Sequence, residues 1–197
     1  MGENTERPTS TIITQSSIFD KGLIVWQEIK ESVTSLAVEN LHLEEDKPLL
    51  GERDDVIAFR NIEEAFLDPK SVAVILRDRS NNSLIGYTLA MPIDRMDPNR
   101  ASEGKETAYI YHAVVAEPYR GQGMVGRLTD PLFLELDRQG FLYVERDSMI
   151  ANGYADNVEK NSKGSIVKSY DHDRFGLGQE RFFRINIQQY LNQKSLG

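Results

Sequence analysis

The sequence Val114-Val115-Ala116-Glu117-Pro118-Tyr119-Arg120-Gly121-Gln122-Gly123-Met124-Val125-Gly126-Arg127-Leu128 places three glycines close together. An apolar, strand-like run over 108–115 precedes them, and a helix-like run over 124–138 follows. In such a turn, backbone N–H groups point into one concavity at the positive end of the helix dipole. Glycine lets the backbone approach an anion closely, and Arg120 adds a fixed positive charge. The stretch therefore predicts a phosphate or pyrophosphate site.

Two familiar phosphate-binding motifs fit this stretch poorly. A Walker A loop needs Gly-Lys-Ser/Thr after its spacer, and none is present. The spacing Gly121-Gln122-Gly123-Met124-Val125-Gly126 does match the dinucleotide fingerprint, and Glu145 lies about twenty residues further on. In that fold the first glycine follows its strand directly, whereas residues 116–120 intervene here. Too little sequence follows the motif to complete a doubly wound sheet, so we disfavour a dinucleotide site.

A third motif fits better. The stretch resembles the acetyl-CoA pyrophosphate loop of the GNAT N-acetyltransferases, which reads (Gln/Arg)-x-x-Gly-x-(Gly/Ala). The run Arg120-Gly121-Gln122-Gly123-Met124 matches its first five positions, and Val125 stands where the family usually has Gly or Ala. The resemblance is sharpest over residues 71–161. It implies an α/β (α+β) fold with a mixed, mostly antiparallel sheet flanked by helices and a splayed strand pair for acetyl-CoA.

The same resemblance implies the residues that bind the cosubstrate, acetyl-CoA. In the family, backbone groups of the strand before the loop hold the pantetheine arm, and the loop holds the pyrophosphate. No metal is expected. The implied cofactor-binding residues are Val114, Val115, Arg120, Gly121, Gln122, Gly123, Met124, Val125 and Gly126.

The acid–base residues follow less directly from the sequence. Acetyl transfer to an amine requires a group that removes a proton from the ammonium, and a group that protonates the leaving thiolate assists. Many GNAT members place this acid as the tyrosine of Asn-x-x-Ala-x-x-Leu-Tyr. Asn152 and Ala155 match that pattern, but Glu159 stands at the tyrosine position. Tyr154 is therefore the candidate acid on this helix, with Glu159 as the alternative.

Other members of the family carry a base on the strand before the loop. That strand offers Glu106, Tyr109, Tyr111 and His112 here. Strand alternation turns the two tyrosines to one face and the histidine to the other. Histidine suits proton transfer near neutral pH, so we predict Tyr111 and His112 as further catalytic candidates.

Composition narrows the class of protein. The chain has 197 residues, no cysteine, three histidines and a formal net charge of −8. The length suits one domain, predicted over 11–197 after a flexible lead over 1–10. The absence of cysteine excludes a cysteine acyl-enzyme and favours the cytoplasm. The acidic balance disfavours nucleic acid as a partner, and no apolar run predicts a membrane partner.

We therefore predict an N-acetyltransferase that moves acetyl from acetyl-CoA directly to an amine of a small molecule or a protein, with a homodimer left open. A non-catalytic acyl-CoA-binding or sensing domain is the first alternative, and a dinucleotide-binding protein is the second. The loops 94–105 and 171–180 are the expected acceptor site, where Asp171, Asp173 and Glu180 can attract a cation.

Hydrophobic periodicity gives the expected elements. Pro131 is expected to kink the second half of the long helix, or to restart it after Asp130. The predicted strands are 11–14, 71–77, 84–91, 106–115, 141–144, 165–170 and 181–187, and the predicted helices are 22–40, 54–67, 124–138 and 149–161.

Overall fold

The computed structural model describes residues 9–14, 68–173 and 178–195. The predicted helices over 22–40 and 54–67 lie outside these ranges. Seven strands form one sheet in the order β1-β2-β3-β4-β5-β7-β6. Their bounds are Thr9–Thr14 (β1), Val72–Arg77 (β2), Leu84–Pro92 (β3), Thr107–Val115 (β4), Tyr143–Met149 (β5), Ile166–Asp173 (β6) and Gln179–Asn186 (β7).

The direction of pairing agrees with the predicted fold class. β4 and β5 are parallel, whereas β1 with β2, β5 with β7 and β6 with β7 are antiparallel. The sheet is thus mixed and mostly antiparallel, and helices flank it. The chain divides into two compact units, Met1–Leu89 with His112–Leu132 and Ala90–Tyr111 with Phe133–Gly197.

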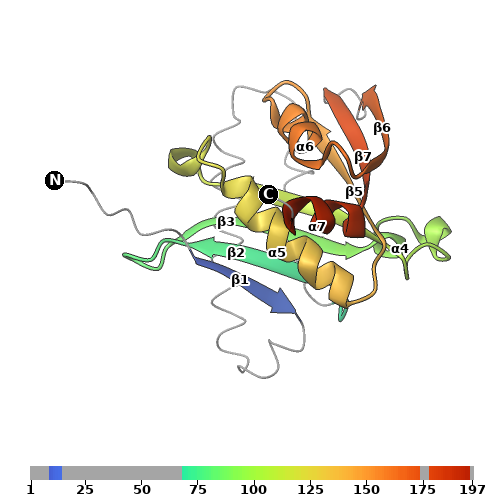
Figure 1. Ribbon diagram of the computed structural model, residues 1–197, viewed down its shortest axis with the longest axis horizontal. Coiled ribbons are helices and arrows are strands. Elements are labelled where there is room, and N and C mark those ends of the chain that lie inside the picture. Colours follow the sequence, from blue (N-terminus) through green and yellow to red (C-terminus); the bar gives the residue numbers. More distant parts are fainter. Residues whose placement is uncertain (1–8, 15–67, 174–177, 196–197) are drawn as a thin grey trace, which may run out of the picture. The chain divides into compact units, whose positions relative to one another are not determined.

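In the first unit, β2 and β3 form the predicted hairpin (Figure 1). The run 72–76 is buried throughout, as its unbroken apolar sequence requires. Asn82 takes a positive φ of 61° in the connecting turn, a conformation that asparagine tolerates. β1 begins at Thr9, somewhat ahead of the predicted start at residue 11.

A close approach between β3 and β4 explains the glycine on β3. A Cβ built on Gly86 would lie 2.9 Å from the carbonyl oxygen of Val114 and 3.5 Å from Cα of Val115. Only glycine fits this backbone contact without a shift. The contact holds the end of β4, from which the glycine-rich loop departs.

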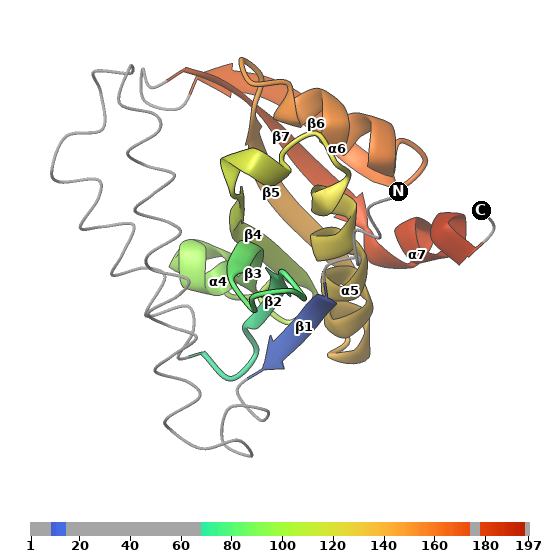
Figure 2. The same ribbon diagram turned by 90° about the vertical axis from the view of Figure 1, so that its left-hand side faces the viewer.

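In the second unit, β5 pairs with β7 over its whole length, and β7 pairs with β6 (Figure 2). Helix α6 (Tyr154–Ser162) packs on β5 and β7 and buries Ala155 and Val158. A C-terminal helix that the sequence did not predict, α7 (Ile187–Ser195), places Tyr190 against Phe133 with ring centroids 4.4 Å apart.

Helix α5 (Met124–Arg138) has the predicted bounds and runs on through Pro131, so of the two predicted effects of that proline the restart after Asp130 does not occur. Several other predicted boundaries are wrong. β5 extends to Met149, and the next helix begins only at Tyr154. The predicted loop 94–105 contains most of α4 (Ile93–Met96) and all of the 3-10 turn η1 (Pro98–Arg100). β6 and β7 extend into the predicted loop 171–180.

Candidate functional site

The glycine-rich loop joins β4 to α5 through the 3-10 turn η2 (Glu117–Tyr119). Gly121 and Gly123 both have φ of +74°, a conformation that residues with a Cβ rarely adopt. Their positions are open, because a Cβ there would meet nothing within 4 Å. The predicted loop therefore forms as a tight, exposed turn at the N-terminus of a helix.

The loop leaves a set of backbone donors available. Within the described part of the chain, the N–H groups of Gly121, Gln122 and Gly123 have no backbone acceptor. The N–H groups of the first turn of α5 have none within the helix, as at any helix start. These donors gather at the positive end of the α5 dipole, where a negatively charged group is stabilised.

Side chains fix the shape of the loop. Nε of Arg120 donates to the carbonyl oxygen of Val115 at 3.0 Å, and Nε2 of Gln122 donates to that of Pro118 at 2.9 Å. The Tyr119 hydroxyl donates to Oδ2 of Asp78 in the β2–β3 turn at 3.0 Å, and this bond raises the pKa of Tyr119. The loop is thereby tied to the end of β4 and to the hairpin.

The end of β4 presents one backbone edge to β3 and the other away from it. The N–H of Ala116 donates to the carbonyl oxygen of Ile85 on β3 at 2.9 Å. Because backbone groups alternate along a strand, those of Val115 point to the opposite edge. The ladder between β4 and β5 pairs Thr107–Tyr109 with Tyr143–Glu145 and ends there. Among the described residues, this ladder includes no residue of β4 beyond Tyr109.

The candidate His112 lies beside a buried tyrosine. Its Nδ1 is 2.5 Å from the hydroxyl oxygen of Tyr87, whose side chain is fully buried. Burial lowers the pKa of His112 from 6.5 to about 4. The imidazole is therefore neutral at pH 7, and its Nδ1 forms a hydrogen bond with the Tyr87 hydroxyl. Tyr111, the neighbouring candidate, is half-buried on β4.

The candidate Tyr154 is the first residue of α6 and has a cationic partner. Nη2 of Arg146 donates to its hydroxyl oxygen at 2.7 Å, and the guanidinium carbon lies 4.7 Å from its ring centroid. Arg146 is only 4% exposed. Because the guanidinium only donates, the Tyr154 hydroxyl keeps its own proton for another acceptor.

Two acidic residues that the sequence singled out are occupied in ion pairs. Glu145 is 1% exposed and binds Arg100 and Arg184, with its closest contact 2.7 Å from Nη1 of Arg100. Glu159, at the family's tyrosine position, lies 2.6 Å from Nη1 of Arg181. These contacts give both carboxylates structural partners in the same unit.

The three charges predicted for the acceptor site have different surroundings. Asp173 is exposed at the end of β6, opposite Gln179 on β7. Asp171 is bound by Arg181, whose Nε lies 2.6 Å from Oδ1, and this hydrogen bond lowers the pKa of Asp171. Glu180 instead lies in a cluster with Asp147 and His172. One carboxylate oxygen of each acid and one ring nitrogen of His172 all lie within 4.8 Å of one another.

The sequence reasoning missed the centre of this cluster. Asp147 accepts from the hydroxyl of Tyr109 at 2.6 Å and lies 2.8 Å from Nε2 of His172. The signal was the alternation of Glu145 and Asp147 in a stretch that proves to be strand β5. Their partners come from distant parts of the chain, so the sequence alone did not bring them together.

Comparisons with known proteins identify the family of the chain. The model of the acetyltransferase (GNAT) family matches residues 36–154, and the chain belongs to this family. A comparison with curated proteins finds no match. Among the described residues, no helix is long and apolar enough to cross a membrane.

Solved structures share the fold at low sequence identity. A GNAT-family acetyltransferase from Staphylococcus aureus Mu50 has a TM-score of 0.56 at 15% identity, covering 91% of this chain and 99% of that one. Aminoglycoside 6'-acetyltransferase type Ii has a TM-score of 0.58 at 18% identity, covering 90% and 97%. A chain of the NatC complex bound to Gag peptide and CoA has a TM-score of 0.57 at 13% identity, covering 90% and 98%.

Proposed function

We propose that this protein transfers the acetyl group of acetyl-CoA directly to the amine of an acceptor. The observation that carries the proposal is the loop at Gly121 and Gly123, both at φ +74°, between the end of β4 and the N-terminus of α5. The chain belongs to the GNAT family, and the N–H groups of Gly121, Gln122 and Gly123 have no backbone acceptor in the described part of the chain. Pyrophosphate is the ligand for which such donors are suited.

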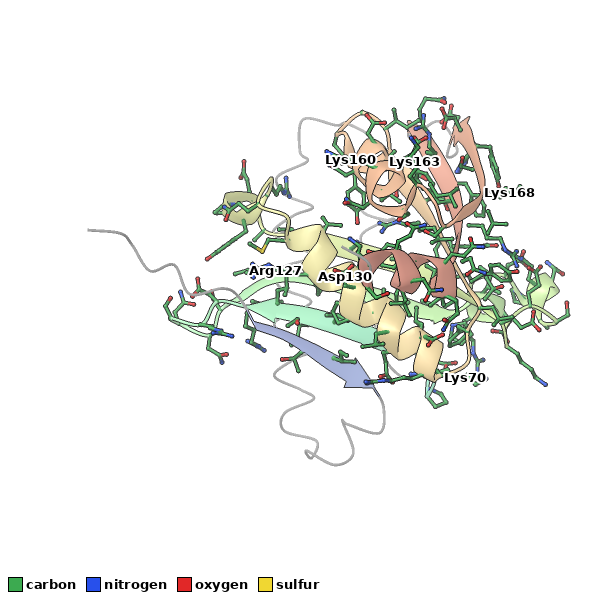
Figure 3. The ribbon with its side chains drawn as sticks, in the orientation of Figure 1. Lys70, Arg127, Asp130, Lys160, Lys163 and Lys168 are labelled. Atoms are coloured by element: carbon green, nitrogen blue, oxygen red, sulfur yellow. The ribbon has the colours of Figure 1, made fainter. Side chains whose placement is uncertain are left out.

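The CoA pyrophosphate is proposed to accept hydrogen bonds from the N–H groups of the loop and the first turn of α5. Two cations add to the attraction. Arg120 lies within the loop, and Arg127 lies on α5 (Figure 3). Val125 at the sixth position of the motif keeps its backbone N–H, so replacing the family's small residue removes no donor.

The pantetheine arm of CoA contains amide groups, which need hydrogen-bond partners when water leaves. We propose that it lies along the edge of β4 that faces away from β3, as an added strand does. The N–H of Val115 is a donor on that edge, whereas the Val115 carbonyl is engaged by Arg120. Val114, held against Gly86, fixes the strand in place.

Tyr154 is the proposed acid for the leaving thiolate. Its hydroxyl oxygen already accepts from Arg146, so its proton is available to an external base. Tyr111 and His112 on β4 are further proposed catalytic residues. The neutral His112 is bonded to Tyr87, which favours a part in holding the strand over a part in proton transfer.

Release of free CoA thiol tests the proposal. Purified protein is mixed with acetyl-CoA and, in separate reactions, with spermidine, kanamycin or a peptide with a free N-terminus. We expect thiol release that depends on one of these amines, together with an acetylated product by mass spectrometry. Tight acetyl-CoA binding without transfer to any amine would favour the non-catalytic binding domain, and binding of NADH in place of CoA would favour the dinucleotide reading.

A further inference from the structure

We propose that Asp147 and His172 form the pair that removes the proton from the acceptor's ammonium group, with Tyr109 holding Asp147 in place. The inference rests on the proposed acetyl transfer and deepens it, because it names the residues that prepare the acceptor. All three residues lie in the second unit, on β4, β5 and β6.

The geometry is that of an oriented histidine. Oδ1 of Asp147 lies 2.8 Å from Nε2 of His172, and Oδ2 accepts from the Tyr109 hydroxyl at 2.6 Å. The Asp147 side chain is 19% exposed and that of His172 is 33% exposed. The carboxylate is thus sheltered, and the imidazole that it binds remains open to a ligand.

These bonds decide which nitrogen can take a proton. An ionised carboxylate only accepts hydrogen bonds, so Nε2 of His172 must carry the proton that points to Asp147. The tautomer is inferred from this network. Nδ1 of the neutral ring is then left with a lone pair. A carboxylate that fixes the tautomer and stabilises the protonated ring plays the same part in other enzymes.

The cluster lies at the end of the ladder between β4 and β5. Tyr109 and Glu145 form the last pair of the parallel ladder, and Asp147 comes two residues later on β5. The hydrogen bond that Asp147 accepts from the Tyr109 hydroxyl joins the two strands just beyond the last ladder pair. β4 continues from Tyr109 to Val115.

The surroundings favour a cation. Glu180 is the direct cross-strand partner of His172 on β7 and adds a second carboxylate to the cluster. Tyr170 stacks on Phe182 at 4.8 Å between ring centroids and lies 5.9 Å from the ring of His172. Carboxylates beside aromatic faces suit a protonated amine with an apolar body.

The proton and electron balance is complete. The ammonium gives one proton to Nδ1 of His172 and becomes a neutral amine. Its lone pair attacks the thioester carbon and forms the C–N bond, and the C–S bond breaks with its electron pair on sulfur. Tyr154 gives its proton to the thiolate, the second proton from the nitrogen restores the Tyr154 hydroxyl, and His172 releases its proton to water.

Replacing His172 by alanine and adding free imidazole tests the role directly. With spermidine, kanamycin and the free-N-terminus peptide as amine probes, we expect kcat of His172→Ala to fall about 100-fold or more, while KM for acetyl-CoA changes little. Imidazole at tens of millimolar should raise the kcat of His172→Ala by at least about tenfold. A merely structural histidine would not be rescued in this way.

A second variant and a control complete the experiment. Asp147→Asn should lower kcat because its amide donates to Nε2 and imposes the wrong tautomer, visible as a switch in the ¹⁵N signals of His172. Lys160→Gln, on the exposed side of α6 (Figure 3) and outside the cluster, should leave kcat unchanged. Wild-type-like kcat in His172→Ala, or no imidazole rescue, would overturn the proposal.

The proposed function can fail separately. Calorimetric acetyl-CoA binding by wild type and His172→Ala is measured in the same series. A wild type that binds acetyl-CoA but acetylates none of the three amines overturns the role of His172 and leaves the CoA site standing. A wild type that does not bind acetyl-CoA overturns the proposed function itself.

Discussion

The side chain of Arg120 turns back over its own loop and donates from Nε to the carbonyl oxygen of Val115 at 3.0 Å. One residue thus joins the glycine-rich turn to the end of β4. The bond takes up the Val115 carbonyl, and the same guanidinium is the proposed contact of the phosphate. The proposed phosphate contact and the shape of the loop therefore depend on the same side chain.

Arg120→Met should weaken acetyl-CoA binding by about 10- to 100-fold, because a hydrogen bond to a charged group contributes about 1.5–3 kcal/mol. The measurement is calorimetric titration with acetyl-CoA. Arg138→Met is the matched control, since Arg138 is 64% exposed at the other end of α5. Equal affinity in the two variants would count against the phosphate contact.

Gly86→Ala should destabilise the fold, because the added Cβ would lie 2.9 Å from the Val114 carbonyl oxygen. Forcing an extra methyl into a packed site costs about 1–3 kcal/mol. Urea unfolding measures the loss. Gly126→Ala provides the contrast: its Cβ would meet nothing within 4 Å on α5, and we expect equal or slightly higher stability. A fully stable Gly86→Ala variant would contradict the close approach.

The buried His112 should make stability depend on pH in an acidic window. Its folded-state pKa of about 4 lies below the ordinary value of 6.5, so the unfolded chain binds a proton first as pH falls. Stability should fall by up to about 3 kcal/mol between pH 6.5 and 4 and then level off. His112→Asn keeps an acceptor for Tyr87 without titrating and should flatten this part of the profile. Identical urea-unfolding profiles for both proteins would refute the assignment.

The ion-pair network around Glu145 should be a major source of stability. Glu145→Gln leaves the largely buried charges of Arg100 and Arg184 without that carboxylate and should cost about 3 kcal/mol. Thermal unfolding measures the change. Glu135→Gln removes a partner of the exposed Arg138 and should cost about 0.5 kcal/mol or less. Similar costs for the two variants would show that burial does not matter here.

The local parts of this structure were the predictable ones. The β2–β3 hairpin and the loop before α5 depend on residues that are neighbours in the sequence. An apolar run and a turn predict the hairpin, and closely spaced glycines predict the loop. α5 continues through Pro131, although its sequence predicted either a kink or a restart there. Its fully buried face, with Leu128, Leu132 and Leu136, gives a packing reason for that continuity.

The less predictable parts depend on distant partners. β5 contains Glu145, Arg146 and Asp147, and three consecutive charged residues do not predict a buried strand. Each finds its partner elsewhere in the chain, such as Arg184, Tyr154 and His172. The candidate amine site has the same origin, because its members come from different strands. Periodicity places each residue on a face but does not say which strands become neighbours.

The central claim is that the loop at Gly123 binds the pyrophosphate of acetyl-CoA. Gly123→Asp places a negative side chain in that turn, and Gly140→Asp is its matched control. Gly140 also has a positive φ, +87°, and open space around it, so backbone strain and added charge are similar. Calorimetry with acetyl-CoA, CoA and NADH should show tight CoA binding in the wild type and the control, and its loss in Gly123→Asp. Retained CoA binding in Gly123→Asp, or NADH binding in its place, would contradict the account.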